Sequence, residues 1–98
     1  MRVTILDAAE KDLEEGYRFY ERQSPGLGSY FLNSLYSDID SLCYFEGIHP
    51  LVFGYYRLLS KRFPFAVYYK IFEDEVLVMA VLDCRRNPSW IREKLMKG

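Results

Sequence analysis

Positively charged side chains interleaved with tyrosines are the residues of this sequence best suited to chemistry. The second half of the chain carries Arg57, Lys61, Arg62, Lys70, Arg85 and Arg86, with Tyr55, Tyr56, Tyr68 and Tyr69 among them. An arginine can hold a phosphate through two parallel hydrogen bonds, and an aromatic face can stack on a nucleic-acid base. The pattern indicates binding to nucleic acid or to an acidic protein. The alternative is that a basic strand edge prevents edge-to-edge aggregation, and the residues alone leave both interpretations open.

Other kinds of catalytic site find no support in the sequence. It contains no glycine-rich phosphate loop, nucleophile elbow or cluster of metal ligands, so we expect neither a metal nor a cofactor. His49 is the only histidine. Because it precedes a proline in a predicted loop, we expect it at the surface or in local capping rather than in catalysis. Cys43 and Cys84 lie in apolar runs and are too few for a disulfide framework, which predicts buried, reduced thiols.

Two apolar runs, residues 63–72 and 76–84, must position the basic residues. Both are rich in Val, Ile, Tyr and Phe, which favours strands, and Glu73 and Asp74 between them predict a hairpin turn in which Asp tolerates left-handed backbone. In the first run the odd-numbered residues from 63 to 71 share one face. In the second run both alternating sets are mostly apolar, so we expect the sheet to be covered on both sides or nearly so.

The remaining segments predict the rest of a small α+β domain. Residues 2–6 and 54–60 favour strands, residues 8–22 and 28–45 amphipathic helices, residues 46–53 a loop, and residues 87 onward a short helix. The helical hairpin must lay its apolar stripe on the sheet, which is the only large apolar surface available. We therefore predict a mainly antiparallel four-stranded sheet with an N-terminal helical hairpin, a short C-terminal helix, and the helices against one side.

Length and composition agree with a single domain over residues 1–98. Half of the residues are hydrophobic and 17% are aromatic, which is typical of a folded core. No run reaches the roughly 18 apolar residues of a membrane helix, and the N-terminus lacks a signal-peptide pattern, so we expect a cytoplasmic protein without membrane contact. The net charge of −1 divides into −5 over residues 1–54 and +4 over residues 55–98. This division indicates an anionic partner for the sheet half, although ordinary solvation explains it equally well.

The stretch YYRLLSKRFPFAVYYKI, followed by VLVMAVLDCRRNPSW, resembles the RelE/ParE superfamily of bacterial type II toxin–antitoxin toxins. The resemblance covers nearly the whole chain and is strongest from residue 55 to residue 90. It implies a toxin that a cognate protein antitoxin holds inactive in a hetero-oligomer. Such antitoxins lay an extended or helical segment over the toxin, and Tyr30, Phe31 and Tyr36 of the helical hairpin are the residues expected to contact it.

The superfamily includes two activities. RelE-like members are ribosome-dependent endonucleases that cut messenger RNA with several basic residues on the sheet and a tyrosine near the C-terminus. ParE-like members inhibit DNA gyrase and lack that full set. By this resemblance Arg57 and Arg86 are the candidate catalytic residues. Leu59, Ala66 and Arg92 stand where RelE-like toxins carry two further basic residues and the tyrosine.

The incomplete set favours ParE-like inhibition of DNA gyrase by protein contact. Metal-free RNA cleavage needs a group that removes the 2′-hydroxyl proton and charges that stabilise the transition state. Cleavage of messenger RNA on the ribosome is the alternative, and an inactive toxin or a binding module of the same fold is the third possibility, so enzyme status stays open. The remaining candidates for target or RNA binding are Lys61, Arg62, Arg85, Arg92 and Tyr68.

Overall fold

The β4–β5 hairpin forms the centre of the sheet in the computed structural model, which describes residues 1–97. Strands β4 (Phe65–Phe72) and β5 (Glu75–Asp83) pair antiparallel along their whole length. The turn between them places Glu73 in the left-handed region, at φ 56°. The predicted hairpin is confirmed, and Glu73 rather than Asp74 adopts the unusual backbone.

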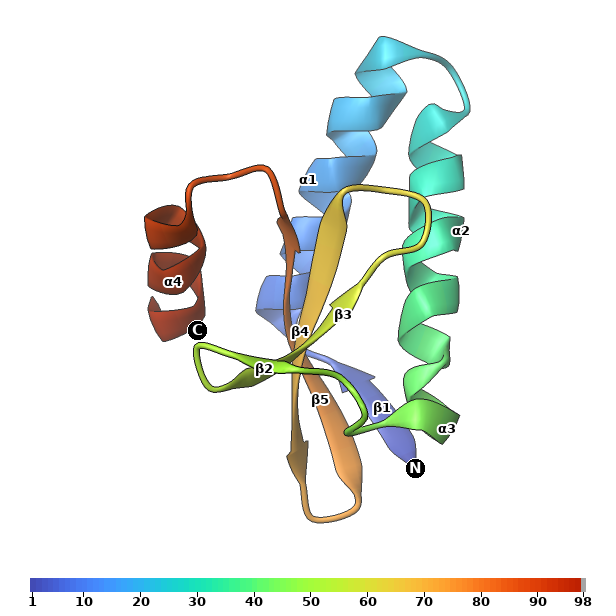
Figure 1. Cartoon of the computed structure of the whole chain (residues 1–98). Helices are drawn as coiled ribbons and strands as arrows, with labels where there is room; N and C mark the ends of the chain where they lie inside the picture. The colour runs from blue at the N-terminus through green and yellow to red at the C-terminus, as the bar shows by residue number, and fades with distance from the viewer. Residues whose placement is uncertain (98) are drawn as a thin grey trace.

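The other elements surround this hairpin (Figure 1). They are β1 (Arg2–Ile5), α1 (Asp7–Gln23), α2 (Leu27–Asp40), α3 (Leu42–Phe45), β2 (Leu51–Val52), β3 (Tyr55–Leu59) and α4 (Pro88–Lys97). The strand order is β1-β5-β4-β3-β2, in which only the β1–β5 pair is parallel. The α+β class and the mainly antiparallel sheet are confirmed. Within residues 1–97 no helix has the length and apolar character needed to cross a membrane.

The sheet has five strands rather than the predicted four, because the segment predicted as a loop contains β2. This strand has two residues and pairs with β3 through Leu51↔Tyr56 and Val52↔Tyr55. The turn between β2 and β3 is made by Phe53 and Gly54, both with positive φ. Positive φ at both central residues is typical of a tight β-hairpin turn. Phenylalanine rarely adopts positive φ, so the sequence Phe53-Gly54 does not predict this turn.

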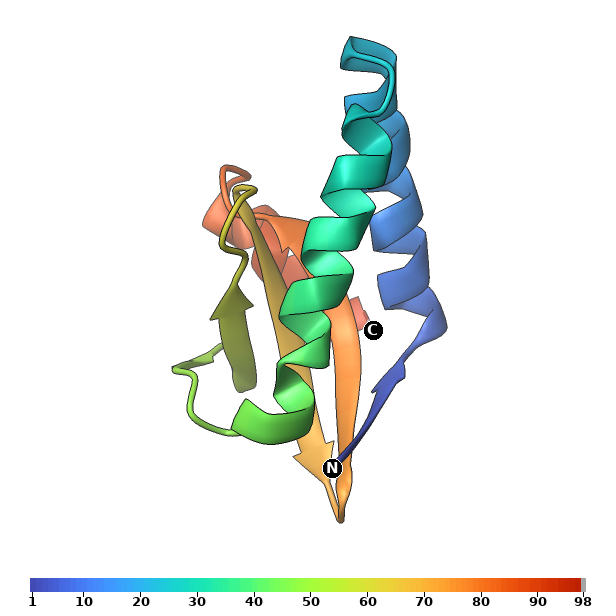
Figure 2. The ribbon, with the colours of Figure 1, turned by 90° about the vertical axis from the view of Figure 1, so that its right-hand side faces the viewer.

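Both faces of the central hairpin are buried, as predicted, but by different helices. Phe65, Val67 and Tyr69 of β4 pack in the cluster that contains the buried residues of α1 and α2. Ala66 and Tyr68 pack in a second cluster with Ile91 and Leu95 of α4. The prediction that all helices lie against one side is therefore wrong. Figures 1 and 2 show α1 and α2 along one face of the sheet and α4 across the strands from them.

A bulge in β5 keeps both of its faces apolar. Tyr68 pairs with Ala80 and Tyr69 with Val78, so Met79 has no partner in β4. The extra residue shifts the alternation by one position, so that Val78 and Val81 face the same helices although they are three positions apart.

The helical hairpin packs closely because glycines face the neighbouring helix. A Cβ at Gly28 would lie 2.7 Å from the backbone oxygen of Tyr17, and a Cβ at Gly16 would lie 2.5 Å from the ring of Phe31. The Phe31 ring is thereby fully buried, with ring centroids 5.2 Å from Tyr20 and 4.9 Å from Phe65. Removing the free space at either glycine would push the helices apart.

We predict that Gly28→Ala lowers the free energy of unfolding by about 1–3 kcal/mol, because the new methyl group meets backbone that cannot move cheaply. This steric effect exceeds the gain of up to about 1 kcal/mol that alanine has over glycine in a helix. Chemical denaturation measures the change, and Ser29→Ala at the exposed neighbouring position is the matched control, with an expected change within about 0.5 kcal/mol. A Gly28→Ala variant more stable than the parent would contradict this packing.

Candidate functional site

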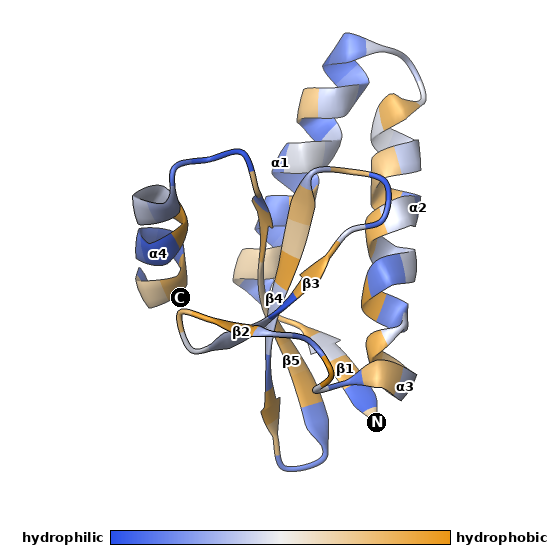
Figure 3. Cartoon of the chain, in the orientation of Figure 1, coloured by the Kyte–Doolittle hydropathy of each residue, from blue (hydrophilic) through white to orange (hydrophobic). Residues whose placement is uncertain are grey.

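Two loops bring the predicted basic residues to one end of the sheet. Lys61 and Arg62 lie between β3 and β4, and Arg85 and Arg86 lie between β5 and α4. The loops are joined by a hydrogen bond from the Cys84 backbone N–H to the Pro64 carbonyl, at 2.8 Å. Figure 3 shows the β5–α4 loop as strongly hydrophilic and the β3–β4 loop as strongly hydrophilic over part of its length, at the same end of the strands. We call Lys61, Arg62, Arg85 and Arg86 the basic end.

Arg85 has an internal partner within the basic end. Its Nε donates to Asp83 Oδ1 at 3.0 Å and its Nη2 donates to Asp83 Oδ2 at 2.8 Å. These hydrogen bonds lower the pKa of the Asp83 carboxyl, despite the opposing effect of partial burial. A guanidinium in such a bidentate pair has less capacity for an external anion. The expectation that Arg85 binds the target is therefore weakened, whereas Lys61 and Arg62 are exposed.

Arg86 stacks on the first turn of α4. Its guanidinium carbon lies 4.0 Å from the centroid of the Trp90 ring, a cation–π contact. Arg86 and Trp90 also line a hollow whose other side is formed by α1. The arginine is thus held by an aromatic face rather than by a carboxylate, and it remains exposed. Arg92, one turn further along α4 from Pro88, is exposed as well.

Arg57 has different neighbours, on the face of the sheet that α4 covers. It pairs across the strands with Tyr68, and it influences the pKa values of both Tyr68 and Cys84. Its Nε is buried and has no hydrogen-bond partner among residues 1–97. The structure therefore brings Arg57 together with Tyr68 and Cys84, and it brings Arg86 together with Trp90, so the two candidate catalytic arginines belong to different surroundings.

Tyr68 and Cys84 differ from their predictions. The Tyr68 side chain is only 2% exposed, so it cannot contact a target directly in this structure. Cys84 is exposed and Cys43 is half-buried, so the prediction of buried thiols is wrong, although both cysteines are free as expected. Burial raises the pKa of the Tyr68 hydroxyl, and partial desolvation raises that of the Cys84 thiol although the residue as a whole is exposed; the nearby Arg57 charge opposes both shifts only in part. Both groups consequently keep their protons at neutral pH.

The predicted antitoxin contacts are not all accessible. Tyr30 is 48% exposed, and its ring centroid lies 5.3 Å from that of Phe63. Tyr36 is half-buried and its hydroxyl donates to Glu10 at 3.4 Å. Phe31 is wrongly assigned, because its side chain is fully buried in the aromatic core. Of the three residues, Tyr30 and Tyr36 remain available for a partner.

His49 anchors a loop, in line with its predicted role. Its Nδ1 meets the hydroxyl of the buried Tyr69, and the Gly47 backbone N–H donates to the same hydroxyl at 2.9 Å. The hydroxyl accepts from Gly47, and its own proton is available to an unprotonated Nδ1. Partial burial lowers the pKa of His49, which favours this neutral form. Residues 1–97 contain no group of three His, Cys, Asp or Glu side chains that could hold a metal ion.

Asp12 of α1 was not among the predicted site residues. Its Oδ2 accepts a hydrogen bond from the backbone N–H of Val81 at 3.0 Å, beyond the end of the β1–β5 ladder. Desolvation raises the pKa of Asp12 to about 6, although the Val81 hydrogen bond and the Lys94 charge act in the opposite direction. The available signal was its spacing, since Asp12 lies three residues after the buried Ala9 and four before the buried Gly16.

Comparison with known proteins identifies the family. Residues 3–88 match the family model for the ParE toxin of the type II toxin-antitoxin system, parDE. The chain belongs to this family. A solved structure of the chromosomal ParDE TA system from P. aeruginosa is similar at a TM-score of 0.75 and 19% identity, covering 83% of this chain and 92% of that chain. The search of curated proteins gives no match.

Membership of the ParE family makes this protein the toxin component of a type II toxin–antitoxin module, and it implies an antitoxin as partner. The family match ends at residue 88, where α4 begins. Arg57, the basic end and Asp12 lie inside the matched segment, whereas Arg92 and Lys94 lie beyond it. The C-terminal helix therefore carries features of this chain that the family match does not cover.

We predict that Asp12→Asn raises the free energy of unfolding relative to the parent, and more so at pH 7 than at pH 4. The folded pKa of Asp12 lies above its ordinary value of 3.8, so the folded state holds a proton that the unfolded state has lost, and stability falls as pH rises through about 6. A shift of this size corresponds to roughly 3 kcal/mol, and solvent screening of a partly exposed group reduces the expected difference to about 1–2 kcal/mol.

Denaturation of both proteins between pH 4 and pH 7 measures this difference. Asparagine keeps a carbonyl oxygen for the Val81 N–H, so the hydrogen bond is preserved and only the ionisation is removed. Asp40→Asn, at an exposed position of α2, controls for the change in net charge. Parallel stability curves for the parent and Asp12→Asn would show that Asp12 is not desolvated as described.

Proposed function

We propose that this ParE-family toxin inhibits DNA gyrase by protein contact, through Arg57, the basic end and Arg92. The family supports a toxin that acts within a ParDE system. The observation that carries the proposal is the chemistry around Arg57. A surface that binds a protein target needs accessible charges and aromatic anchors, whereas a nuclease also needs a proton acceptor beside the reacting group.

The proton-transfer groups near Arg57 argue against RNA cleavage. Tyr68 is buried, and the raised pKa values of its hydroxyl and of the Cys84 thiol leave neither group ionised at neutral pH. A protonated hydroxyl or thiol cannot remove the 2′-hydroxyl proton. His49, the only histidine of the sequence, supplies no free Nδ1 as a base, because this nitrogen is hydrogen-bonded to the Tyr69 hydroxyl.

The side chains that replace the RelE-like cations give the same answer. Leu59, which is 55% exposed, and Ala66, which is fully buried, both have uncharged side chains. Neither therefore supplies positive charge to the sheet face. Arg57 is consequently the single cation that β3 contributes to this face. An exposed leucine beside a half-buried arginine suits an interface core with a polar rim better than a phosphate-transfer site.

The target is tested by adding the purified toxin to two assays in parallel. Loss of supercoiling by purified gyrase, with messenger RNA intact in a translating extract, is the result expected. Cleavage of messenger RNA with unchanged supercoiling would replace the proposal by the RelE-like activity. Induced expression without antitoxin should arrest bacterial growth, and continued growth in the presence of soluble, folded toxin would exclude an active toxin of either kind.

We expect Arg57→Ala and Arg86→Ala each to raise the toxin concentration for half-maximal gyrase inhibition by about tenfold. Loss of one charged contact at a desolvated interface costs about 1.5–3 kcal/mol, which corresponds to a tenfold change or more. The matched control is Arg18→Ala, an exposed arginine of α1 paired with Glu14 away from the basic end. Thermal unfolding verifies that each variant is folded. Unchanged inhibition of gyrase by both Arg57→Ala and Arg86→Ala would show that these arginines only solvate the surface.

A further inference from the structure

The segment from α3 to the β2–β3 turn exposes much of the apolar surface of this protein. Of the eleven large apolar side chains that are exposed in residues 1–97, five lie between residues 44 and 53. They are Tyr44, Phe45, Ile48, Leu51 and Phe53, with exposed fractions from 48% for Phe53 to 83% for Tyr44. We call these five side chains the apolar strip. Single exposed apolar residues are common on protein surfaces, whereas their concentration in one short segment indicates an interaction site.

Almost no charge accompanies the apolar strip. Glu46 is the only charged residue of the sequence between Asp40 and Arg57. Its Oε2 is buried and has no hydrogen-bond partner among residues 1–97, so the carboxylate is turned inward. Partial burial lowers the pKa of His49, which keeps its imidazole uncharged at neutral pH. The surface of this segment is therefore both apolar and neutral, the composition found at the core of protein interfaces.

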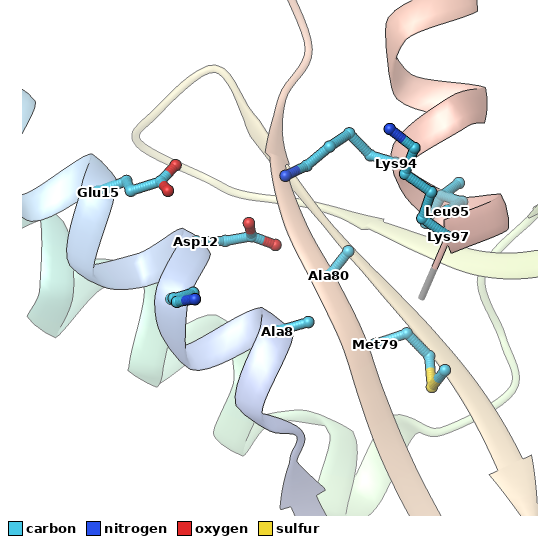
Figure 4. Close-up of a pocket in the computed structure, with 9 residues that line it drawn as sticks. Ala8, Asp12, Glu15, Met79, Ala80, Lys94, Leu95 and Lys97 are labelled. Atoms are coloured by element: carbon cyan, nitrogen blue, oxygen red, sulfur yellow. The ribbon is translucent and has the colours of Figure 1, made fainter.

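Charged side chains are frequent on the surfaces outside the apolar strip. Figure 4 shows Asp12, Glu15 and Lys94 around the hollow between α1 and α4. The basic end lies elsewhere again, since Figure 1 shows α3, the loop after it and β2 apart from the two loops that carry the basic end. A partner bound at the apolar strip consequently leaves the basic end accessible.

The backbone under the apolar strip is held in place. The hydroxyl of the buried Tyr69 accepts a hydrogen bond from the Gly47 N–H at 2.9 Å and meets His49 Nδ1, which ties the loop after α3 to the sheet. The N-terminal ammonium group of Met1 donates to the Cys43 carbonyl at 3.2 Å, which fixes α3. An ordered segment therefore presents the apolar side chains, and this order lowers the entropy cost of binding.

A second copy of this chain fits such a surface. In a contact across a twofold axis the same patch of both copies meets, so charged residues near the axis would face like charges at a cost in free energy. A neutral apolar surface avoids this cost. A strongly acidic or basic partner gains nothing from it, because the apolar strip offers neither cations nor exposed carboxylates.

The size of the apolar strip also suits a dimer. The exposed fractions of its five side chains add up to about three whole side chains. Because an aromatic side chain buries roughly 150–250 Å², the apolar strip presents roughly 500 Å². Two copies would bury about 1,000 Å² from these side chains alone, which is the size at which specific interfaces begin.

We propose that this toxin forms a homodimer in which the apolar strips of two copies pack on each other across a twofold axis. Ile48 and Leu51, the two aliphatic residues at the centre of the segment, lie closest to the axis. The basic ends of both copies stay outside the interface, so each remains available for a target. This inference depends neither on gyrase as the target nor on contact with the antitoxin.

Sedimentation equilibrium of the purified toxin tests the dimer. The parent should associate reversibly with a micromolar dissociation constant. Ile48→Lys combined with Leu51→Lys places like charges at the axis and should raise that constant about a hundredfold. The matched control, Leu59→Lys combined with Met96→Lys, adds the same charges at exposed apolar positions outside the apolar strip and should leave the constant unchanged within about twofold. A monomeric parent, or equal weakening by both pairs, would overturn the proposal.

A mixture of two variants tests the twofold arrangement. Ile48→Glu combined with Leu51→Glu should dissociate as readily as the lysine pair, because like charges again meet at the axis. When the two variants are mixed, opposite charges meet, and a heterodimer should form about tenfold tighter or more than either variant binds itself. A mixture that associates no better than its components would contradict the contact between apolar strips. Thermal unfolding verifies that each variant is folded.

Titration with the antitoxin and with gyrase distinguishes the other possible occupants. If the parent is monomeric and the lysine pair loses affinity for one of these proteins, the apolar strip belongs to that partner and the homodimer is excluded. Because the sedimentation measurement contains no gyrase, its failure leaves the supercoiling result intact, and a negative supercoiling result leaves the dimer intact.

Discussion

The burial of the β4–β5 hairpin on both faces is the constraint on which the rest of the structure depends. Tyr68 and Tyr69 are adjacent in the sequence, point to opposite faces and are each 2% exposed or less. Burying an aromatic ring contributes roughly 2–3 kcal/mol, so neither face can be left to water. The α1–α2 hairpin covers one face and α4 covers the other. Since the faces are occupied, the exposed cations of the candidate site lie at the end of the strands and on α4, whereas Arg57 on β3 is half-buried.

The position of the helices in turn decides which edge stays open. The chain leaves β1 after Ile5 to begin α1, so β1 is too short to cover all of β5. The inner side of α1 then passes over the uncovered edge and supplies Asp12 to the Val81 N–H. A desolvated carboxylate that accepts one backbone N–H stabilises the edge of the sheet less than a paired strand would. The raised pKa of Asp12 reflects this imbalance.

Periodicity predicted most of the fold but not the contacts that depend on the third dimension. Alternation and helical spacing identified four of the strands and the two long helices, because each burial pattern is local. Phe31 was misplaced because its burial depends on the missing side chain at Gly16 of another helix. The Arg85–Asp83 pair is not predictable from the pattern, because Asp83 lies at the end of a strand, where the backbone direction decides whether the two side chains meet. The side of the sheet that α4 covers depends on a loop whose direction no pattern encodes.

The basic end and the covered face of the sheet meet at the start of α4. Arg86 stacks on Trp90 there, and both residues line the hollow between α1 and α4. Trp90 in turn packs against the cluster that Ile91 and Leu95 form with Tyr68. The packing of this short helix on the sheet therefore fixes the position of the Arg86 guanidinium, and it links the covered face to the surface that is proposed to contact the target.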